Sequence, residues 1–359
     1  MKKIFLRAYY NFNFGDDLFI DFLLRKYNNC LFYIDNRKYK YLVKKYKNVK
    51  ICSNVFLSLY NKILSRFNLY KYHTSNYYVK KSDAILTIGG SMFIEKSKMT
   101  FYDYLYDNYY KLNNNYYIIG ANFGPYTSED YLKKNEEFFR IAKDVCFRDI
   151  KSYQLFKKKG INVRYSPDII FGYKKYLPKN IKEKDKLFIS IINLKNRKEL
   201  AKYHEQYINE INKIIECFVK RGYDIDVCSF CQNEGDEEIV NEISSNFPNK
   251  INCIFYRGDI NMILNEMMES KLIIGTRFHS LILGIIMEKN ILPISYSIKT
   301  DNLLEDLNFK GKKYSIKDFK NVDIGDMFNE KQRVKEYENL VLNSSNNFKI
   351  IDEYIKGIK

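Results

Sequence analysis

The stretch Leu-Ile-Ile-Gly-Thr-Arg-Phe-His-Ser-Leu-Ile-Leu-Gly at residues 272–284 joins one apolar run to a second, near-continuous apolar segment. The first run predicts a buried strand and the second a buried helix, so a strand-to-helix turn falls between them. Such a turn directs backbone N–H groups and the positive end of a helix dipole toward one point. The turn carries Arg277 and His279 and no acidic residue. It therefore predicts a site for a small anion, at the place where an open α/β sheet binds its ligand.

The same order of strand, turn and helix recurs along the whole chain. Apolar runs predict further strands at residues 4–10, 84–88, 116–119, 144–147, 163–165, 187–192, 224–230, 252–256 and 292–296. Helical patterns cover residues 16–27, 205–220 and 260–268, and another begins near residue 236. This alternation is typical of α/β folds in which helices cover parallel sheets.

A polar, charged segment at residues 173–185, which contains Pro178, separates two such halves. A chain of 359 residues favours two domains over one. Because this segment is polar, charged and contains a proline, it is the predicted linker between them. The sequence from about residue 330 onward is charged and has a helical pattern. We therefore expect two consecutive α/β domains followed by a helical C-terminal tail.

The chain carries a formal charge of +17, from 60 Lys and Arg against 43 Asp and Glu. Such a charge suits nucleic acid or an anionic membrane surface. It also suits a chain whose lysine, asparagine, tyrosine and isoleucine are all abundant, as an AT-rich genome would give. The lysines form no run of five or six, which favours the second interpretation.

Targeting and cysteine patterns point to a reducing cytosol. The apolar run after Met1-Lys2-Lys3 stops at Arg7, too early for a signal peptide, and no apolar run reaches the length of a membrane span. Any membrane contact is therefore expected to be peripheral.

The chain has seven cysteines, an odd number in a chain of this length, so no disulfide framework is expected. The pair Cys228 and Cys231 has the CxxC spacing; a redox role is open, but two buried thiols at a strand end fit the pattern better. It has no second pair and no nearby histidine, so no metal site is expected.

Polar side chains and glycines follow several of the predicted strands, where ligands of parallel sheets bind. In chain order they are Asp16, Gly89, Gly90, Glu95, Asn122, Arg148, Arg277, His279 and Lys299. Each has a simpler structural interpretation: a helix cap for Asp16, a tight turn for the two glycines, a surface pair with Asp149 for Arg148. Together, the four potential cations would suit a ligand with more than one acidic group. The dinucleotide and P-loop glycine signatures are both absent.

The order of these motifs resembles the polysaccharide pyruvyl transferase family over roughly residues 4–307. The matching segments are Asn13-Phe14-Gly15-Asp16-Asp17, Leu86-Thr87-Ile88-Gly89-Gly90, Gly120-Ala121-Asn122-Phe123-Gly124-Pro125, Phe147-Arg148-Asp149-Ile150-Lys151-Ser152, Pro167-Asp168, Gly275-Thr276-Arg277-Phe278-His279-Ser280 and Lys299 before Leu303-Leu304-Glu305-Asp306-Leu307. Two segments depart from the pattern. Ser91 stands where many relatives have a third glycine, and the polar loop at residues 232–236 is diverged.

The resemblance implies a GT-B-like fold, in which two Rossmann-like domains with parallel sheets face each other across a cleft. Residues 1–172 would form the N-terminal domain on the acceptor side, and residues 173–185 the linker. Residues 186–325 would form the C-terminal domain on the donor side, and helices at 326–359 would pack back. It also implies transfer of pyruvate from phosphoenolpyruvate, as a ketal, to a pair of sugar hydroxyls on a surface polysaccharide or its lipid-linked precursor.

By the same resemblance the donor is held by Arg148, Arg277, His279 and Lys299. For the chemistry, His279 is our candidate general acid, with phosphate binding as its alternative role, and Arg277 assists it. Asp16, Gly89, Gly90, Glu95 and Asn122 are acceptor-side candidates, and Asp16 or Glu95 is the candidate base. Phosphoenolpyruvate is a co-substrate, and we expect neither a cofactor nor a metal.

Two other functions stay open at the level of sequence. The first is a nucleotide-sugar glycosyltransferase on the same GT-B fold, because a fold does not determine a function. The second is a basic, non-catalytic protein that binds nucleic acid or a membrane surface, which only the net charge favours. We expect a cytoplasmic protein, in contact at most with the inner face of the membrane, and no nucleic-acid partner.

Overall fold

The computed structural model describes residues 1–96, 98, 103, 105 and 108–357. The chain folds into two compact units. The first unit comprises residues 1–10, 19–169 and 343–359, and the second comprises residues 11–18 and 170–342. Residues 358 and 359 of the predicted tail lie outside the described residues.

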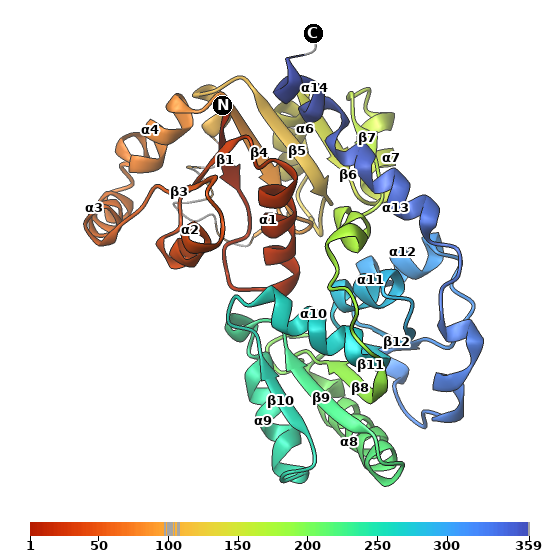
Figure 1. Cartoon of the computed structure of the whole chain (residues 1–359). Coiled ribbons are helices and arrows are strands. Elements are labelled where there is room, and N and C mark those ends of the chain that lie inside the picture. Colours follow the sequence, from red (N-terminus) through yellow and green to blue (C-terminus); the bar gives the residue numbers. More distant parts are fainter. Residues whose placement is uncertain (97, 99–102, 104, 106–107, 358–359) are drawn as a thin grey trace. The chain divides into compact units, whose positions relative to one another are not determined.

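The first unit is built on a seven-stranded parallel sheet with the order β3-β2-β1-β4-β5-β6-β7 (Figure 1). The strands are β1 (Lys3–Arg7), β2 (Leu31–Ile34), β3 (Val49–Ile51), β4 (Ala84–Ile88), β5 (Tyr116–Ala121), β6 (Asp144–Phe147) and β7 (Arg164–Tyr165). The connecting helices include α1 (Phe14–Lys26), α2 (Leu42–Lys45), α3 (Val55–Arg66), α4 (Thr74–Lys81), α6 (Glu129–Ile141) and α7 (Ile150–Lys158). The strand order reverses between β1 and β4, where Phe5 lies opposite Ile85.

The second unit has a six-stranded parallel sheet with the order β10-β9-β8-β11-β12-β13. The strands are β8 (Lys184–Ser190), β9 (Asp224–Ser229), β10 (Asn252–Phe255), β11 (Ser270–Gly275), β12 (Asn290–Ser295) and β13 (Tyr314–Ser315). The helices are α8 (His204–Lys220), α9 (Asp236–Asn246), α10 (Ile260–Glu269), α11 (Phe278–Ile286), α12 (Ile298–Asp306) and α13 (Glu338–Ser344). Its order reverses between β8 and β11, which pair directly.

Strand periodicity explains how both faces of this second sheet are covered. Leu272 and Ile274 of β11 join the core that α8 and α9 complete, while Ile273 points the other way. On that other side α11 approaches closely at Gly284, where an added Cβ would lie 2.6 Å from Ile291 and 3.4 Å from Ile273. Because both faces are buried, the strands are near-continuous apolar runs, as the sequence at residues 272–275 indicates.

The C-terminal helix α14 (Lys349–Lys356) belongs to the first unit. Asp352 accepts hydrogen bonds from Lys26 (3.0 Å) and from the hydroxyl of Tyr27 (2.6 Å), and Phe348 stacks on Phe22. The predicted linker segment is partly helical, because a 3₁₀ helix covers residues 169–176 before β8 begins. Residues 11–18, which the sequence-based boundaries place in the N-terminal domain, group with the second unit, and residues 343–359 of the C-terminal tail group with the first.

All seven cysteines are free, and Cys228 and Cys231 are buried. Burial raises the pKa of the Cys228 thiol well above its ordinary value and that of Cys231 to about 12. Neither thiol is therefore an activated nucleophile near neutral pH. Within the described part of the chain, no helix is both long enough and apolar enough to cross a membrane.

A buried histidine caps α4 and gives the first unit a specific pH dependence. The Nδ1 atom of His73 accepts a hydrogen bond from the backbone N–H of Ser75 at 3.3 Å, which requires that this nitrogen be unprotonated. Burial lowers the pKa of His73 to about 4. Between pH 6.5 and 4 the unfolded chain binds a proton here that the folded chain does not, so His73 lowers stability as pH falls through this range.

We predict that His73→Asn removes this contribution, because asparagine caps a helix without titrating. Relative to the variant, the wild type should lose about 1–3 kcal/mol of unfolding free energy between about pH 6.5 and 4. Denaturant unfolding of both proteins across this range measures the difference. Burial raises the pKa of Asp35 to about 6, so Asp35 changes the stability in the opposite direction as pH falls. This effect is common to both proteins and cancels in the difference between them. Parallel pH profiles for the two proteins would contradict the assignment.

Candidate active site

The Gly275–Ser280 turn lies at the reversal point of the second sheet, at the carboxyl end of β11. Arg277 is the N-cap residue of α11, and the Ser280 hydroxyl donates to the Arg277 carbonyl at 2.6 Å. The same hydroxyl lies 2.7 Å from that of Ser190, at the end of β8. An added Cβ at Gly275 would come within 2.3 Å of Leu281, so the close turn requires glycine. These contacts hold the turn in one conformation at the edge where parallel sheets bind ligands.

Residues 11–18 bring the start of α1 into the second unit. The backbone N–H of Phe14 donates to the Phe230 carbonyl at 3.0 Å, and Asn13 donates to Glu234 at 3.3 Å. The Asn13 side chain also accepts from the N–H of Gly15, so the helix begins at Phe14, two residues before the predicted start. Asp16 lies half-buried in the first turn and is not the cap. The Asn13–Asp17 motif thus lies beside the polar loop after β9, although the two segments are far apart in the sequence.

The imidazole of His279 packs directly on the backbone of Gly15. A Cβ added to Gly15 would lie 1.9 Å from Nδ1 of His279 and 2.8 Å from its Cγ. Two motifs that are far apart in the sequence therefore meet within one unit. Asp16, predicted to belong to the N-terminal domain, lies next to this contact in the chain and groups with the second unit. Lys299, half-buried in the first turn of α12, follows the neighbouring strand β12 at the same edge of the sheet.

Arg277 is buried and makes ion pairs with two carboxylates. Its guanidinium pairs with Asp236 through Nη2 and with Glu234 through Nη1, the latter at 2.7 Å. Its Nε donates to the carbonyl of Ile191 at 3.4 Å. The turn itself carries no acid, but two acids from the loop after β9 largely neutralise its arginine. The guanidinium is held in a defined plane and does not act as an isolated positive charge.

Opposing effects set the protonation of this cluster. Burial raises the pKa of Glu234, but the charge of Arg277 and its hydrogen bond outweigh that effect and leave this pKa below its ordinary value. At Asp236 burial is the larger effect and raises the pKa. Arg197 adds a second cation, 2.9 Å from Glu234.

Sequence reasoning missed Arg197, Glu234 and Asp236 as parts of this site. A signal was present, since Arg197 follows β8 and the two acids follow β9, and the carboxyl ends of these strands lie at the same edge as that of β11. Asp236 also accepts from the backbone N–H groups of Asn193 (3.2 Å) and Cys231 (3.2 Å). It therefore joins the loops after β8, β9 and β11.

A second cluster of predicted residues forms in the first unit around Arg148. Its guanidinium pairs with Asp168 at 2.7 Å and donates to the Asn122 side chain at 3.1 Å, and all three side chains are buried. Gly90 lies under the same guanidinium, because an added Cβ would come within 2.0 Å of its Cζ. Gly89 precedes it with a φ of 128°, which favours glycine. Arg148 thus does not form a surface pair with its neighbour Asp149, which instead caps α7 through Ser152.

Glu95 has a structural role in the first unit. Its carboxylate accepts from the hydroxyl of Thr127 (2.9 Å) and the backbone N–H of Ser128 (3.0 Å), just before α6 begins. A backbone hydrogen bond from Thr127 is the main cause that holds the pKa of Glu95 below its ordinary value. A carboxylate engaged in this way is poorly placed to serve as a base.

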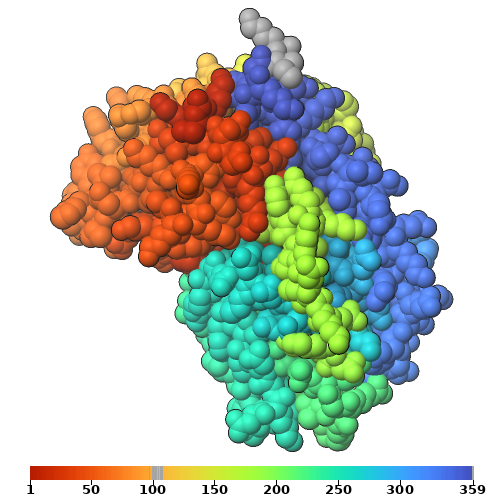
Figure 2. Space-filling model, viewed as in Figure 1, coloured from red at the N-terminus to blue at the C-terminus, as the bar shows by residue number. Residues whose placement is uncertain are grey.

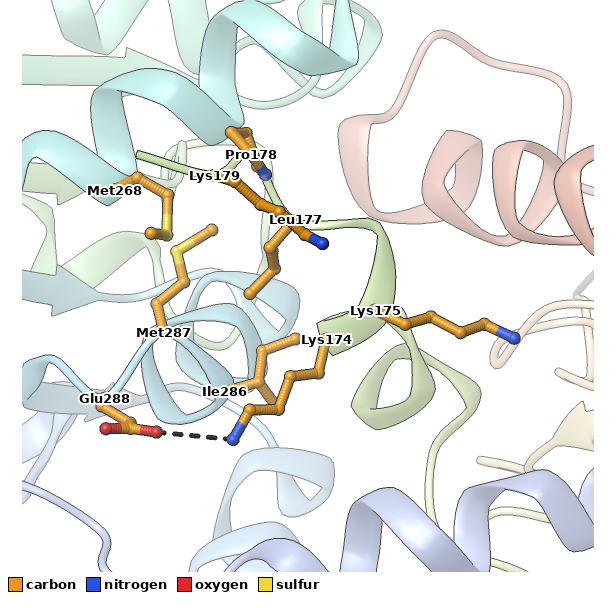
Figure 3. Close-up of a pocket in the computed structure, with 9 residues that line it drawn as sticks. All are labelled: Lys174, Lys175, Leu177, Pro178, Lys179, Met268, Ile286, Met287 and Glu288. Atoms are coloured by element: carbon orange, nitrogen blue, oxygen red, sulfur yellow. Dashed lines mark hydrogen bonds and ion pairs between the residues drawn. The ribbon is translucent and has the colours of Figure 1, made fainter. Parts of the chain in front are cut away.

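A pocket of about 400 Å³ in the second unit lies at the C-terminal end of α11, whereas His279 lies in the first turn of that helix. Figure 3 shows the residues that line the pocket. Its lining joins residues of the predicted linker to the ends of α10 and α11: Lys174, Lys175, Leu177, Pro178, Lys179, Met268, Ile286, Met287 and Glu288. Figure 3 shows the Lys174 ammonium directed at Glu288, 3.4 Å away, and the two methionines turned toward each other. None of the predicted site residues lines this pocket.

A sequence model of the polysaccharide pyruvyl transferase family matches residues 13–298. The chain belongs to this family. The match begins at Asn13 and ends at Ile298, so it spans the Asn13–Asp17 motif, the Arg148 cluster and the Arg277–His279 turn. It confirms the resemblance that these motifs carry in the sequence, and it supports a transferase of polysaccharide biosynthesis. A search of curated proteins finds no match.

Several solved structures superpose on this pyruvyl transferase family member over almost its whole length. S. aureus MnaA, solved with UDP, superposes with a TM-score of 0.65 at 13% identity, covering 100% of this chain and 98% of its own. Anabaena HepE, solved with UDP and glucose, gives 0.58 at 12% identity, with 99% and 100% covered. The UDP-GlcNAc 2-epimerase of Methanocaldococcus jannaschii gives 0.54 at 13% identity, with the same coverage. At these identities the likeness shows the fold alone, and it confirms the predicted GT-B-like α/β class with parallel sheets.

The contact between Gly15 and His279 predicts a measurable coupling. Gly15→Ala should destabilise the protein by about 1–3 kcal/mol, because the new methyl group overlaps the imidazole. In a His279→Ala background the ring is gone, and the same change should cost little, as alanine is favoured within a helix. Urea unfolding of the wild type, both single variants and the double variant gives the coupling energy. A coupling near zero would contradict the packing of the ring on Gly15.

Proposed function

We propose that this protein transfers pyruvate from phosphoenolpyruvate to two neighbouring hydroxyls of one sugar, forming a ketal on a surface polysaccharide or its lipid-linked precursor. The observation that carries the proposal is the family match over residues 13–298, which includes the Asn13–Asp17 motif, the Arg148 cluster and the Arg277–His279 turn. The proposal places the reaction in the cytoplasm and requires neither a metal nor a cofactor.

The donor carries a carboxylate and a phosphate, and the second unit offers groups that suit such anions. Within the described residues, neither α11 nor α12 has a side-chain cap hydrogen bond at its N-terminus, and both begin at the ligand-binding edge of the sheet. Helix N-termini bind anions through their N–H groups and dipole. His279 and Lys299 lie in these two first turns and would bind the donor there.

Arg277 also belongs to this proposed donor site, with a modified role. Two of its nitrogens pair with Asp236 and Glu234, so it would meet the donor with a partly neutralised, firmly oriented guanidinium. The two acids are positioning residues in this scheme. Arg148 is the remaining proposed donor-binding residue, and its pairing with Asp168 and Asn122 orients its guanidinium in the same manner.

The chemistry begins with protonation of the vinyl CH₂ of phosphoenolpyruvate, which becomes a methyl group and leaves an oxocarbenium-like carbon. In our scheme protonated His279 supplies that proton. One sugar hydroxyl adds to the carbon, phosphate departs, and the neighbouring hydroxyl closes the ketal ring. The two hydroxyl protons pass to the base and to the departing phosphate. The cationic side chains of the site and the helix N-termini stabilise the charge that develops on the phosphate.

Asp16 is our preferred base for the sugar hydroxyl. It follows Gly15, on which the His279 ring packs, and it lies half-buried in the first turn of α1. The alternative, Glu95, is engaged at the start of α6. Gly89, Gly90 and Asn122 remain proposed acceptor-side residues, of which Gly90 and Asn122 also contact Arg148.

We predict that His279→Ala lowers phosphate release from phosphoenolpyruvate in the presence of acceptor by about 10²–10⁴-fold, the range for loss of a general acid. Phosphoenolpyruvate affinity, measured by calorimetry, should change far less if the ring acts mainly as an acid. His204→Gln is the matched control, since this histidine of the same unit pairs with Glu242 on α9. Near-normal turnover by His279→Ala would rule out the acid role, and an equal loss in binding would assign the ring to donor binding.

A further inference from the structure

The segment at residues 36–82 of the first unit is strongly basic and contains no acid. It carries twelve basic side chains and no aspartate or glutamate: Arg37, Lys38, Lys40, Lys44, Lys45, Lys47, Lys50, Lys62, Arg66, Lys71, Lys80 and Lys81. All twelve are exposed. Much of the +17 charge of the chain therefore lies in about one eighth of its length, on a continuous stretch around β3, α3 and α4.

Helix α3, within this segment, exposes its apolar side chains. Five of them occupy one side of the helix and a sixth follows it: Val55, Phe56, Leu59, Tyr60, Ile63 and Phe67. Phe56 is 82% exposed and Phe67 is 65% exposed. The opposite side of α3 holds it on the protein, because Leu64 is buried and Asn61 bonds to Thr74 at the start of α4.

The apolar surface continues beyond α3. Leu69, Tyr70, Tyr72 and Tyr77 are each more than 40% exposed and lie on the residues that lead into and form α4. Tyrosine has an apolar ring and a polar hydroxyl, a combination typical of the boundary between water and lipid. Figure 1 shows α3 and α4 in orange, and Figure 2 shows the same segment forming part of the surface. Exposed apolar surface of this extent usually marks an interaction site.

We infer that α3 and the segment at residues 67–77 dock this protein on an anionic lipid surface. Charge complementarity favours lipid as the occupant. The segment itself holds twelve cations and no acid, and although Lys45 pairs with Asp21 of α1, such a stretch matches a layer of phosphate headgroups. A second copy of the chain would bring two such basic segments together, which is electrostatically unfavourable. The mixture of phenylalanine, leucine, isoleucine and tyrosine, with Lys62 and Arg66 on the same helix, fits a helix that lies in the interface plane.

Two contributions to docking, one electrostatic and one apolar, come from different residues of the segment. The lysines and arginines bring the first unit to the headgroups, an attraction that salt weakens. The side chains of Phe56, Ile63 and Phe67 then enter the boundary between headgroups and acyl chains, which salt affects little. This surface is independent of the donor and acceptor chemistry above, and it would keep an enzyme with a lipid-linked acceptor close to its substrate.

Vesicle flotation tests the inference with the full-length protein and no donor or acceptor. We expect binding to vesicles of about 30% phosphatidylglycerol and 70% phosphatidylcholine, and at least tenfold weaker binding to pure phosphatidylcholine. Phe56→Ser/Ile63→Ser should lower the partition coefficient on anionic vesicles by at least tenfold. The matched control is Ile141→Ser/Leu342→Ser, which removes two side chains of 50% and 69% exposure elsewhere and should bind like the wild type.

A second variant tests the electrostatic part. Lys62→Gln/Arg66→Gln should lower binding several-fold at low salt and reduce its salt dependence. Unfolding curves like that of the wild type confirm that each variant folds. Failure of the wild type to bind anionic vesicles, or equal binding by the α3 variant and the control, would overturn the inference. So would a wild-type dimer, detected by light scattering, that Phe56→Ser/Ile63→Ser dissociates, because the face would then be an interface between copies. Since no substrate is present, these outcomes do not depend on the proposed transferase activity.

Discussion

The buried ion pairs of Arg277 with Asp236 and Glu234 are the interaction on which the proposed site in the second unit depends. Taking an arginine out of water costs several kcal/mol unless partners compensate its charge. Here the partners come from the loop after β9, and the guanidinium also reaches the loop after β8. Glu234 in turn accepts from Asn13, which positions the start of α1. One charged cluster thus determines where His279, Gly15 and Asp16 lie.

A similar construction occurs in the first unit. Arg148 is buried over Gly90 and is oriented by Asp168 and Asn122. In both units an arginine that follows a strand is held by an acid and covers or adjoins a glycine-containing loop: Arg148 follows β6, and Arg277 follows β11. Orienting a guanidinium in advance lowers the entropy lost when it binds a planar carboxylate or a phosphate. Each cluster by itself therefore presents an oriented guanidinium, a group that suits a carboxylate or a phosphate.

Local sequence patterns predicted much of this fold, and long-range contacts account for what they missed. The apolar runs of β4, β5, β8, β9 and β11 are explicit in the sequence because both faces of each sheet are buried. Strands β2 and β3 escaped prediction, since they are short and β3 alternates with exposed Lys50 in a lysine-rich segment. The pairing of Arg277 with Asp236 joins residues 41 positions apart, and only the position of Asp236 after a predicted strand hinted at it in the sequence. Residues 11–18 group with the second unit through long-range contacts that periodicity cannot reveal, among them the hydrogen bonds of Phe14 to Phe230 and of Asn13 to Glu234.

The net charge of the chain indicates a function only when the positions of the charged residues are considered. Scattered lysines favour a compositional origin, yet a segment of nearly fifty residues without one acid, beside an exposed apolar helix, indicates a surface with a partner. This surface and the proposed donor site are built from different residues and can be tested apart.

The central claim is that the Arg277–His279 turn serves a pyruvyl donor and not a nucleotide sugar, although solved structures of the same fold hold UDP. Calorimetric titration of the wild-type protein with phosphoenolpyruvate and, separately, with UDP-N-acetylglucosamine tests it most directly. Our account predicts saturable binding of phosphoenolpyruvate that is at least tenfold tighter than that of the nucleotide sugar. Tighter binding of UDP-N-acetylglucosamine, with no detectable binding of phosphoenolpyruvate, would contradict it.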